Sequence, residues 1–517
     1  MKIRFLALAL AGASMSATAQ AEWWEARSNH FVVFNEGSEK DTKDFATTLE
    51  RFDNSLRILQ NLPVGEPVPE TAKVTVYRYG RTSDIGVLAG YDGVAGFYIP
   101  RAANPVAFSP AREDRVLGSF QRVDKRLELS PLVVLFHEYT HHFMLRNFNA
   151  AYPSWYVEGF AEVNSTLELR DDGSFVVGKP ANHRSAELFR MNQISVRRLL
   201  DPTNRVDTVE EQLSKYSLGW LLIHYLTFDQ SRQGQLVRYL DAVGKGENSL
   251  VAAERIFGDL GNLERELTKY KSSNLPGVVV GVPQYTPPKV TLRKLTPEES
   301  DLMRERIFLA RGVTRKKAAA LEDGLSTKAQ AEPGNFTAQI LASEAALDSR
   351  RYANAIAAAD RAIAIAPDSM DAHVFKARAL IENPDGDPER FAEARKILGT
   401  AHSIDETDPR PLIETYNSWR KQGVAIPVQG ILALEAAFPL AAQDDTYRLL
   451  LTRQLLEEKK YDLGVTVIAP LAYSFDGSDP KKDVPTLVLA AVNDEKYDEA
   501  LSLLNKEIAK RSGDGDT

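Results

Sequence analysis

Residues 130–141 read SPLVVLFHEYTH, an apolar run that leads directly into an H-E-x-x-H box. Ser130 and Pro131 are residue types expected at the N-cap and in the first turn of a helix. The apolar run follows this start without a break and ends at the first histidine of the box. The box is therefore predicted to begin inside a helix.

Two histidines at this spacing can share one metal ion. His137 and His141 are four residues apart, so on a helix both imidazoles lie on the same face. Zinc suits them because it accepts imidazole nitrogens at about 2.0–2.1 Å and has no strong angular preference. Glu138 follows the first ligand and is expected to take a proton from a zinc-bound water. The alternative is a buried helix that uses these polar groups structurally. With eight histidines in 517 residues, a chance box is expected in roughly one chain in a hundred.

A second helix is expected directly after the first, over residues 153–162, which read PSWYVEGFAE. Ser154 can cap it, and the short connection makes the two helices antiparallel neighbours. Glu158 then returns to the level of the histidines and can supply a carboxylate as third ligand. Glu162, one turn later, can accept a hydrogen bond from the free ring nitrogen of a ligand histidine. Gly159 is expected to let the helices approach closely. Two histidines and one glutamate leave a position open for water, which is typical of a catalytic zinc site.

The combined pattern resembles the gluzincin metallopeptidases, the superfamily of thermolysin and the aminopeptidase N-type enzymes. It is most similar to the bacterial peptidase-MA-like proteins, whose W-x-x-E-G-x-A-E box matches residues 155–162. The resemblance covers residues 22–275. It implies an α+β fold with a zincin-like peptidase domain, in which a mixed sheet accompanies the metal-binding helices, and Zn²⁺ as the cofactor. The matching residues are His137, Glu138, His141, Glu158 and Glu162.

The sequence departs from the best-known gluzincins in one spacing. Sixteen residues separate His141 from Glu158, a couple fewer than in those enzymes, and a shorter loop between the helices would absorb the difference. The metzincin alternative is excluded because its glycine and third histidine positions hold Met144 and Asn147. The G-x-M-E-N box of aminopeptidase N-type enzymes is not found, which favours an endopeptidase.

Tyr216 is the candidate for a second catalytic group. The resemblance implies a tyrosine on a helix downstream of the ligand glutamate, whose hydroxyl donates a hydrogen bond to the tetrahedral oxyanion. Residues 216–226 form the segment most similar to that helix. The alternative, that Tyr216 is an ordinary core residue of an apolar helix, stays open. His224 and Tyr225 have weaker claims, and His142 is expected to be structural because it faces about 100° away from the second ligand.

The N-terminus has the form of a cleavable secretory signal. Residues 1–21 combine Lys2 and Arg4 with a short apolar stretch and end in the A-x-A form of a signal-peptidase site. Cleavage is expected near Ala21. The sequence contains no cysteine, which excludes disulfides, thiolate ligands and a lipid anchor on cysteine. The predicted location is the bacterial periplasm or the exterior.

The charge of the chain also limits its partners. The formal net charge is −8, and removal of the signal brings it to about −10. This disfavours nonspecific nucleic-acid binding as the main role. After the signal, no stretch is long and apolar enough to cross a membrane.

The segment before the box is predicted to mix strands with a helix. The expected strands are residues 30–34, 72–79, 93–99 and 105–108, and the expected helix is 44–62. Glycines and prolines around the last two strands indicate a sheet edge. The resemblance implies an edge strand that binds substrate backbone by strand addition, while a plain hairpin without a binding role is the alternative. After the box, residues 166–177 are predicted to form a hairpin that turns at Asp171-Asp172-Gly173, and residues 185–270 to be helical.

A boundary is expected at residues 276–298, which contain five prolines and are predicted to be a linker. Residues 299–510 are then predicted to form a separable domain of tetratricopeptide-like helical repeats. Residues 352–367 resemble the second helix of such a repeat, and Phe391 begins an echo 39 residues later, against 34 for the ideal repeat. A repeat domain offers a concave surface to a protein partner or substrate segment, or it braces the peptidase.

Two classes of function remain. The first is an exported zinc-dependent peptidase that hydrolyses peptide bonds of a peptide or protein substrate, with Glu138 as general base. The second is a catalytically silent zincin joined to a repeat scaffold that binds protein partners. The intact Glu138 argues against the second class. Hydrolysis of a non-peptide amide is a third, weaker hypothesis, and the substrate itself cannot be identified from the sequence.

Overall fold

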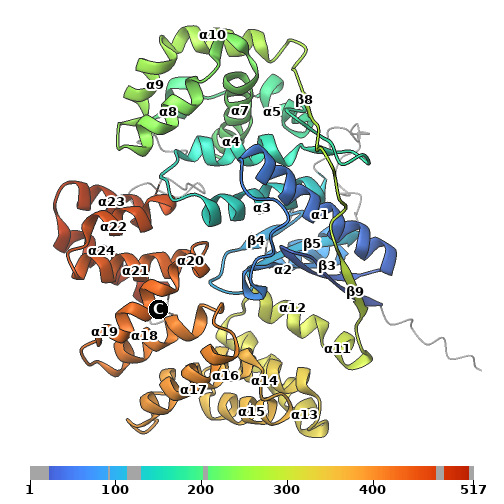
Figure 1. The fold of residues 1–517 in the computed structure, drawn as a ribbon, viewed down its shortest axis with the longest axis vertical. Helices are drawn as coiled ribbons and strands as arrows, with labels where there is room; N and C mark the ends of the chain where they lie inside the picture. The colour runs from blue at the N-terminus through green and yellow to red at the C-terminus, as the bar shows by residue number, and fades with distance from the viewer. Residues whose placement is uncertain are drawn as a thin grey trace, which may run out of the picture.

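The computed structural model describes residues 22–90, 94–112, 130–191, 193–201, 208–472 and 483–511. They form an α+β fold with a six-stranded mixed sheet, a smaller three-stranded sheet and a long helical C-terminal region (Figure 1). The predicted signal peptide lies outside the described residues, as does Gly93 at the start of a predicted strand. None of the helices in the described ranges is both long and apolar enough to span a membrane.

The larger sheet has the strand order β4-β5-β3-β2-β1-β9. Its central strands β2, β3 and β5 are parallel. β4 pairs antiparallel with β5, β1 pairs antiparallel with β2, and β9 pairs antiparallel with β1. The four strands predicted before the box are confirmed as β2 to β5, with β4 shorter than expected and at the edge, where the glycines and prolines placed it. The bounds are β1 Trp23–Arg27, β2 Phe31–Glu36, β3 Val74–Arg81, β4 Phe97–Ile99, β5 Val106–Arg112 and β9 Thr291–Lys294.

Both faces of this sheet are covered by helices, because successive strand residues point to opposite sides and both sets are apolar. One face packs against α1 (Glu39–Leu59), confirming the predicted helix, and against α3 (Pro131–Asn147), the helix that carries the box. Phe52 of α1 stacks on Phe136 of α3 with ring centroids 3.8 Å apart. The other face packs against α2 (Thr82–Ala89) and α12 (Met303–Arg311).

Residues 276–298 do not run free of the first domain. β8 (Val278–Val280) pairs with β7, and β9 pairs with β1 as the last strand of the larger sheet. Leu295, Met303 and Ile307, which follow, are buried in the core on the α2 side of that sheet. The segment predicted as a linker therefore contributes two strands to the first domain, and the chain leaves that domain only after α12.

The helices beyond the box gather above the sheet in Figure 1. They confirm the predicted helical region, and the hairpin before them is confirmed as β6 and β7, with Gly173 at the turn adopting a φ of 86°. The bounds are α4 Ser154–Ser165, β6 Glu168–Leu169, β7 Phe175–Val177, α5 Ser185–Arg190, α6 Val196–Leu200, α7 Val209–Phe228, α8 Gln235–Gly244, α9 Ser249–Phe257 and α10 Leu260–Tyr270.

Gly159 serves a different helix from the one expected. A Cβ at this position would lie 2.6 Å from the backbone of Gly219 on α7, and Gly219 in turn faces the backbone of Trp155. The two glycines therefore allow α4 and α7 to pack backbone to backbone. The close approach predicted between α4 and α3 is not what this glycine provides.

The C-terminal region is a row of antiparallel helices that curves along one side of the first domain (Figure 1). The helix predicted at 352–367 is confirmed as α15, and the echo at Phe391 as α17. Two later aromatic anchors, Tyr461 and Tyr497, stack on each other with centroids 3.6 Å apart. The bounds are α11 Pro297–Asp301, α13 Arg315–Ala331, α14 Phe336–Asp348, α15 Tyr352–Ile365, α16 Met370–Glu382, α17 Arg390–Ile404, α18 Arg410–Gln422, α19 Val428–Ala436, α20 Phe438–Ala441, α21 Asp445–Glu457, α22 Tyr461–Ile468, α23 Val484–Asn493 and α24 Tyr497–Arg511.

Glu344 on α14 lies where the helical C-terminal region meets the first domain. Burial raises the pKa of its carboxyl, Asp348 and Asp371 add to the effect, and Arg101 and Arg306 of the first domain oppose it. The result is a pKa raised to about 7. A carboxyl in this state holds its proton more tightly in the folded protein than in the unfolded chain, so its ionisation weakens the fold.

This shift predicts a pH dependence of stability. As pH rises through about 7, the stability associated with protonated Glu344 is lost, because the folded pKa lies above the unfolded value. We expect the thermal midpoint of wild type to fall, relative to Glu344→Gln, between pH 5 and pH 8. Scanning fluorimetry across that range measures the difference, with the exposed Glu389→Gln as control. Parallel curves for wild type and Glu344→Gln would contradict the assignment.

Candidate metal centre

The box lies on α3, as predicted. Ser130 is the N-cap, and its hydroxyl accepts a hydrogen bond from the backbone N–H of Leu132, while Pro131 occupies the first turn. α3 ends at Asn147, and α4 follows after a short connection and packs against it. Ser154 was expected to be the N-cap of α4. The N-cap is Pro153 instead, and the helix begins at Ser154, one residue earlier than expected.

The structure brings His137, His141 and Glu158 together. The two Nε2 atoms lie 3.0 Å apart, and Glu158 Oε2 lies 3.3 Å from that of His137 and 3.5 Å from that of His141. All three side chains are mostly buried, with exposed fractions of 12%, 20% and 13%. These three groups can therefore present one nitrogen or oxygen each to a single point.

The spacing fits a tetrahedral zinc ion. Ligand atoms about 2.05 Å from the centre of a regular tetrahedron lie about 3.3 Å from one another. Glu158 Oε2 is also buried without a hydrogen-bond partner among the described residues, although two ring nitrogens are close. A buried carboxylate oxygen of this kind needs a partner, and a cation held by all three groups would supply one.

The electrostatics of the cluster favour ionised Glu158. Burial opposes the charged carboxylate, but the two imidazoles outweigh it and hold its pKa below the usual range. Burial likewise opposes a charged His137, yet the nearby carboxylates of Glu158 and Glu162 raise its pKa to about 10. The two carboxylates thus surround the imidazole of His137 with negative charge, which favours a positive charge at this place.

Glu138 lies beside this cluster without being part of it. Burial raises the pKa of its carboxyl, the two histidines lower it, and Glu158 raises it further. Among the described residues, its carboxylate makes no hydrogen bond or ion pair. A carboxyl whose pKa is raised by burial takes up a proton more readily than an ordinary one, which suits a general acid–base group.

Glu162 is placed against the back of His137, with Oε1 3.4 Å from Nδ1. Two residues that the sequence analysis did not single out hold this carboxylate. His183 Nε2 lies 3.0 Å from its Oε2, and Arg184 donates to its Oε1. Both come from a short 3₁₀ helix, Asn182–Arg184, just after the β6–β7 hairpin. Nothing in the local pattern distinguishes them, because their role depends on a contact with a residue about twenty positions earlier.

This contact predicts an effect of Glu162→Ala. Partners that orient a ligand histidine typically contribute 10–100-fold in metal affinity or activity. We expect zinc affinity or turnover to fall within about that range, with some of both remaining. Zinc competition against a chromophoric chelator measures the first.

The matched control for Glu162 is Glu187→Ala. Glu187 also pairs with Arg184, at 3.6 Å, but forms no ion pair with His137. It should leave zinc affinity nearly unchanged. Equal losses in both variants would assign the effect to Arg184 and not to the orientation of the histidine.

Tyr216 on α7 also reaches the cluster. Its ring centroid lies 6.1 Å from that of His137, and the guanidinium of Arg184 lies over its ring, 5.0 Å from the centroid. Burial and the charge of Glu158 raise its pKa, so the hydroxyl remains a hydrogen-bond donor at neutral pH. Its side chain is hydrogen-bonded to Gln212. Tyr216 therefore stands within the candidate site as a neutral donor.

The weaker candidates lie elsewhere. His224 contacts the hydroxyl of Tyr270 and the carbonyl of Gly178, each at 2.9 Å, and is fully buried. Tyr225 donates to Glu266. His142, expected to be structural, contacts the hydroxyl of Tyr98 on β4 at 2.7 Å. Burial lowers the pKa of His142 to about 3, so the ring is neutral.

A second buried cluster, His30, Glu50 and Asp53, also has three possible ligand atoms within reach of one another. Its carboxylates already have donors. Asp53 accepts hydrogen bonds from Tyr139 at 2.7 Å and from Arg57 at 2.6 Å, and Glu50 lies 2.6 Å from His30 Nδ1. Because Arg57 supplies positive charge here, the cluster acts as a hydrogen-bond network that ties α1 to β2 and α3.

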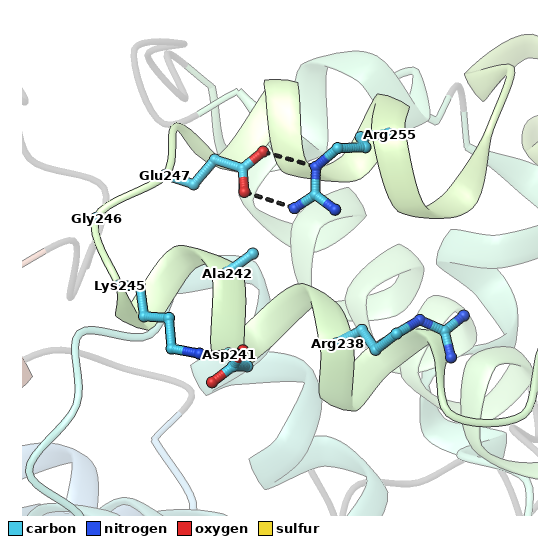
Figure 2. A pocket seen from close by; sticks show the side chains of 7 residues that line it. All are labelled: Arg238, Asp241, Ala242, Lys245, Gly246, Glu247 and Arg255. Carbon is cyan, nitrogen blue, oxygen red and sulfur yellow. Dashed lines mark hydrogen bonds and ion pairs between the residues drawn. The ribbon is translucent and has the colours of Figure 1, made fainter.

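A pocket of about 560 Å³ lies apart from these groups, between α8 and α9 (Figure 2). Its charged lining residues are largely paired with one another. Glu247 accepts two hydrogen bonds from Arg255, and Lys245 donates to Asp241 at 2.8 Å. No residue of the candidate metal cluster lines it.

A comparison of this sequence with models of known protein families gave no match, and a comparison with curated proteins gave none either.

Proposed function

We propose that this protein is an exported zinc-dependent peptidase, most simply an endopeptidase, built on a zincin-like domain. The observation that carries the proposal is the convergence of His137, His141 and Glu158 at distances of 3.0–3.5 Å, with a buried carboxylate oxygen that has no hydrogen-bond partner among the described residues. Two histidines and one carboxylate are the ligand set of many hydrolytic zinc sites.

Zinc held by these residues would supply a Lewis acid and would lower the pKa of a coordinated water toward 7. Glu138 would accept the proton of the attacking water and transfer it to the leaving nitrogen. Its raised pKa supports both steps, because the same carboxyl must take the proton and then give it up.

Tyr216 would donate a hydrogen bond to the oxygen that becomes negative as the peptide carbonyl is attacked. Its hydroxyl stays protonated, and Arg184 over its ring holds it beside His137. Glu162 would fix the orientation of His137 through Nδ1. Three residues that are not ligands would thus act on the proton, the oxyanion and the ligand, respectively.

The fold supports a peptide substrate. β4 lies at the open edge of the larger sheet, pairs only with β5 among the described strands, and is tied to α3 by the contact between Tyr98 and His142. An edge strand next to the metal helix offers unpaired backbone groups to an extended peptide. We propose that β4 aligns the substrate backbone beside the cluster.

Metal removal tests the function. Treatment of the purified protein with a chelator is expected to abolish cleavage of a proteome-derived peptide mixture, and one equivalent of Zn²⁺ to restore it. Ca²⁺ should not restore cleavage, because it requires six to eight oxygen ligands. Mass spectrometry of the products gives the cleavage pattern. Undiminished cleavage by metal-free protein would refute the proposal.

A further inference from the structure

The corner between α20 and α21 is inserted between two parts of the first domain that border the candidate site (Figure 1). One part is the C-terminal end of α3. The other is the connection that leaves β4 at Arg101 and Ala102. Two buried polar residues of the corner, Gln443 and Arg448, contact these parts, and each has an exposed fraction of 0%.

Gln443 uses its whole amide group across this boundary. Its Nε2 donates to the carbonyls of Arg101 at 2.9 Å and Ala102 at 3.1 Å. Its Oε1 accepts a hydrogen bond from Arg146, in the last turn of α3, at 3.1 Å. Gln443, a side chain of the C-terminal helices, therefore joins the end of α3 to the segment that directly follows β4.

Arg448 closes the same end of α3. It donates to the carbonyl of Leu145 at 3.1 Å and to the side-chain oxygen of Asn149 at 3.3 Å. The last carbonyls of a helix lack partners within the helix, and a cation there also opposes the negative end of the helix dipole. The same guanidinium donates to Ala442 and Val467 within the repeats.

The apolar contacts follow the same path. Leu145 of α3 and Ala102 both pack against the core of the repeats that contains Leu449 and Leu450. Within the first domain, Tyr98 of β4 and His142 of α3 are in direct contact at 2.7 Å. The corner, the edge strand and the metal helix thus form one buried, hydrogen-bonded unit.

We propose that Gln443 and Arg448 are positioning residues, which set the spacing between β4 and α3 and thereby couple the repeats to the candidate active site. Only the effect of this spacing on substrate binding rests on the proposed function; the contacts of Gln443 and Arg448 with α3 do not. The repeats would then be a structural part of the site, and a change in their curvature would alter substrate binding at β4.

Gln443→Met is the sharpest test, because it keeps the length of the side chain and removes three hydrogen bonds that all cross the boundary. The first measurement is amide hydrogen exchange, which needs no activity. Exchange in residues 142–149 is expected to rise about tenfold or more, the effect of losing a hydrogen bond to a charged group. Exchange in α15 to α17 should not change.

The second measurement is the split between KM and kcat for a fluorogenic peptide that wild type cleaves. KM should rise several-fold while kcat and zinc affinity change little. Arg448→Met should act in the same direction. Arg395→Met is the matched control, since the hydrogen bonds of Arg395 go to Ser418 and Gln422, which both lie on α18 of the C-terminal region.

Unchanged exchange at residues 142–149 in both Gln443→Met and Arg448→Met would overturn the inference. A uniform increase over all helices would do the same, because it indicates general loss of stability. If wild type cleaves no peptide, the proposed function fails, and the exchange measurement still decides whether the corner holds α3.

Discussion

Glu138→Gln is expected to keep its zinc and to lose nearly all turnover. The substitution preserves the shape of the side chain and removes its ability to accept a proton. Glu138 lies beside the candidate ligand cluster, and burial raises the pKa of its carboxyl, so the carboxyl takes up a proton more readily than an exposed one. General acid–base catalysis contributes roughly 10²–10⁴-fold. Peptide cleavage and zinc content of the same preparation are the two measurements.

The comparison that separates an enzyme from a scaffold is made in the cell. In a deletion strain, the catalytically silent alternative predicts that Glu138→Gln restores the phenotype as well as wild type does. Glu168→Gln is the matched control, because Glu168 is exposed and pairs with Lys179 in the β6–β7 hairpin. Full rescue by stably expressed Glu138→Gln would refute the enzymatic interpretation.

His141→Ala is expected to lose most of its metal. The variant leaves two ligands from α3 and α4, His137 and Glu158, and removes the nitrogen that lies 3.0 Å from one and 3.5 Å from the oxygen of the other. A site with two protein ligands cannot hold zinc as the three-ligand site does. We therefore expect less than stoichiometric zinc after dialysis and no measurable peptide cleavage.

His402→Ala provides the control for that experiment, since His402 lies on α17 in the repeats and not on α3 or α4. It should retain one zinc ion per chain. Elemental analysis after dialysis, together with competition against a chelator, measures both variants. Stoichiometric zinc at unchanged affinity in His141→Ala would show that the ligands are assigned wrongly.

Local sequence patterns predict the parts of this site that lie within one or two helices. The start of α3 at Ser130 and Pro131 could be predicted because helix capping depends on the nearest residues along the chain. The helical period alone places His137 and His141 on one face. The antiparallel return that brings Glu158 and Glu162 to them follows from the short connection between α3 and α4.

Contacts between residues far apart in the sequence could not be predicted from local patterns. His183 and Arg184 meet Glu162 only because the chain returns to α4 after the β6–β7 hairpin, and no local period encodes that contact. Gly159 was expected to let α4 pack closely against α3, but it lets α4 pack closely against α7. A glycine indicates that another backbone approaches, and it does not identify which one. β9 lies within a Pro-rich segment and is only four residues long. A strand of that length is too short for an alternating pattern to stand out.

The sequence by itself determined the candidate ligands, the candidate general base and the helices that carry them, because these depend on spacings of a few residues. Only the tertiary structure decided what surrounds them. It placed Tyr216 beside His137, joined residues 291–294 to β1, and set Gln443 between β4 and α3. The physical reason is that each of these contacts joins segments roughly 80 to 350 positions apart, and packing of the whole chain, not local backbone preference, brings such segments together.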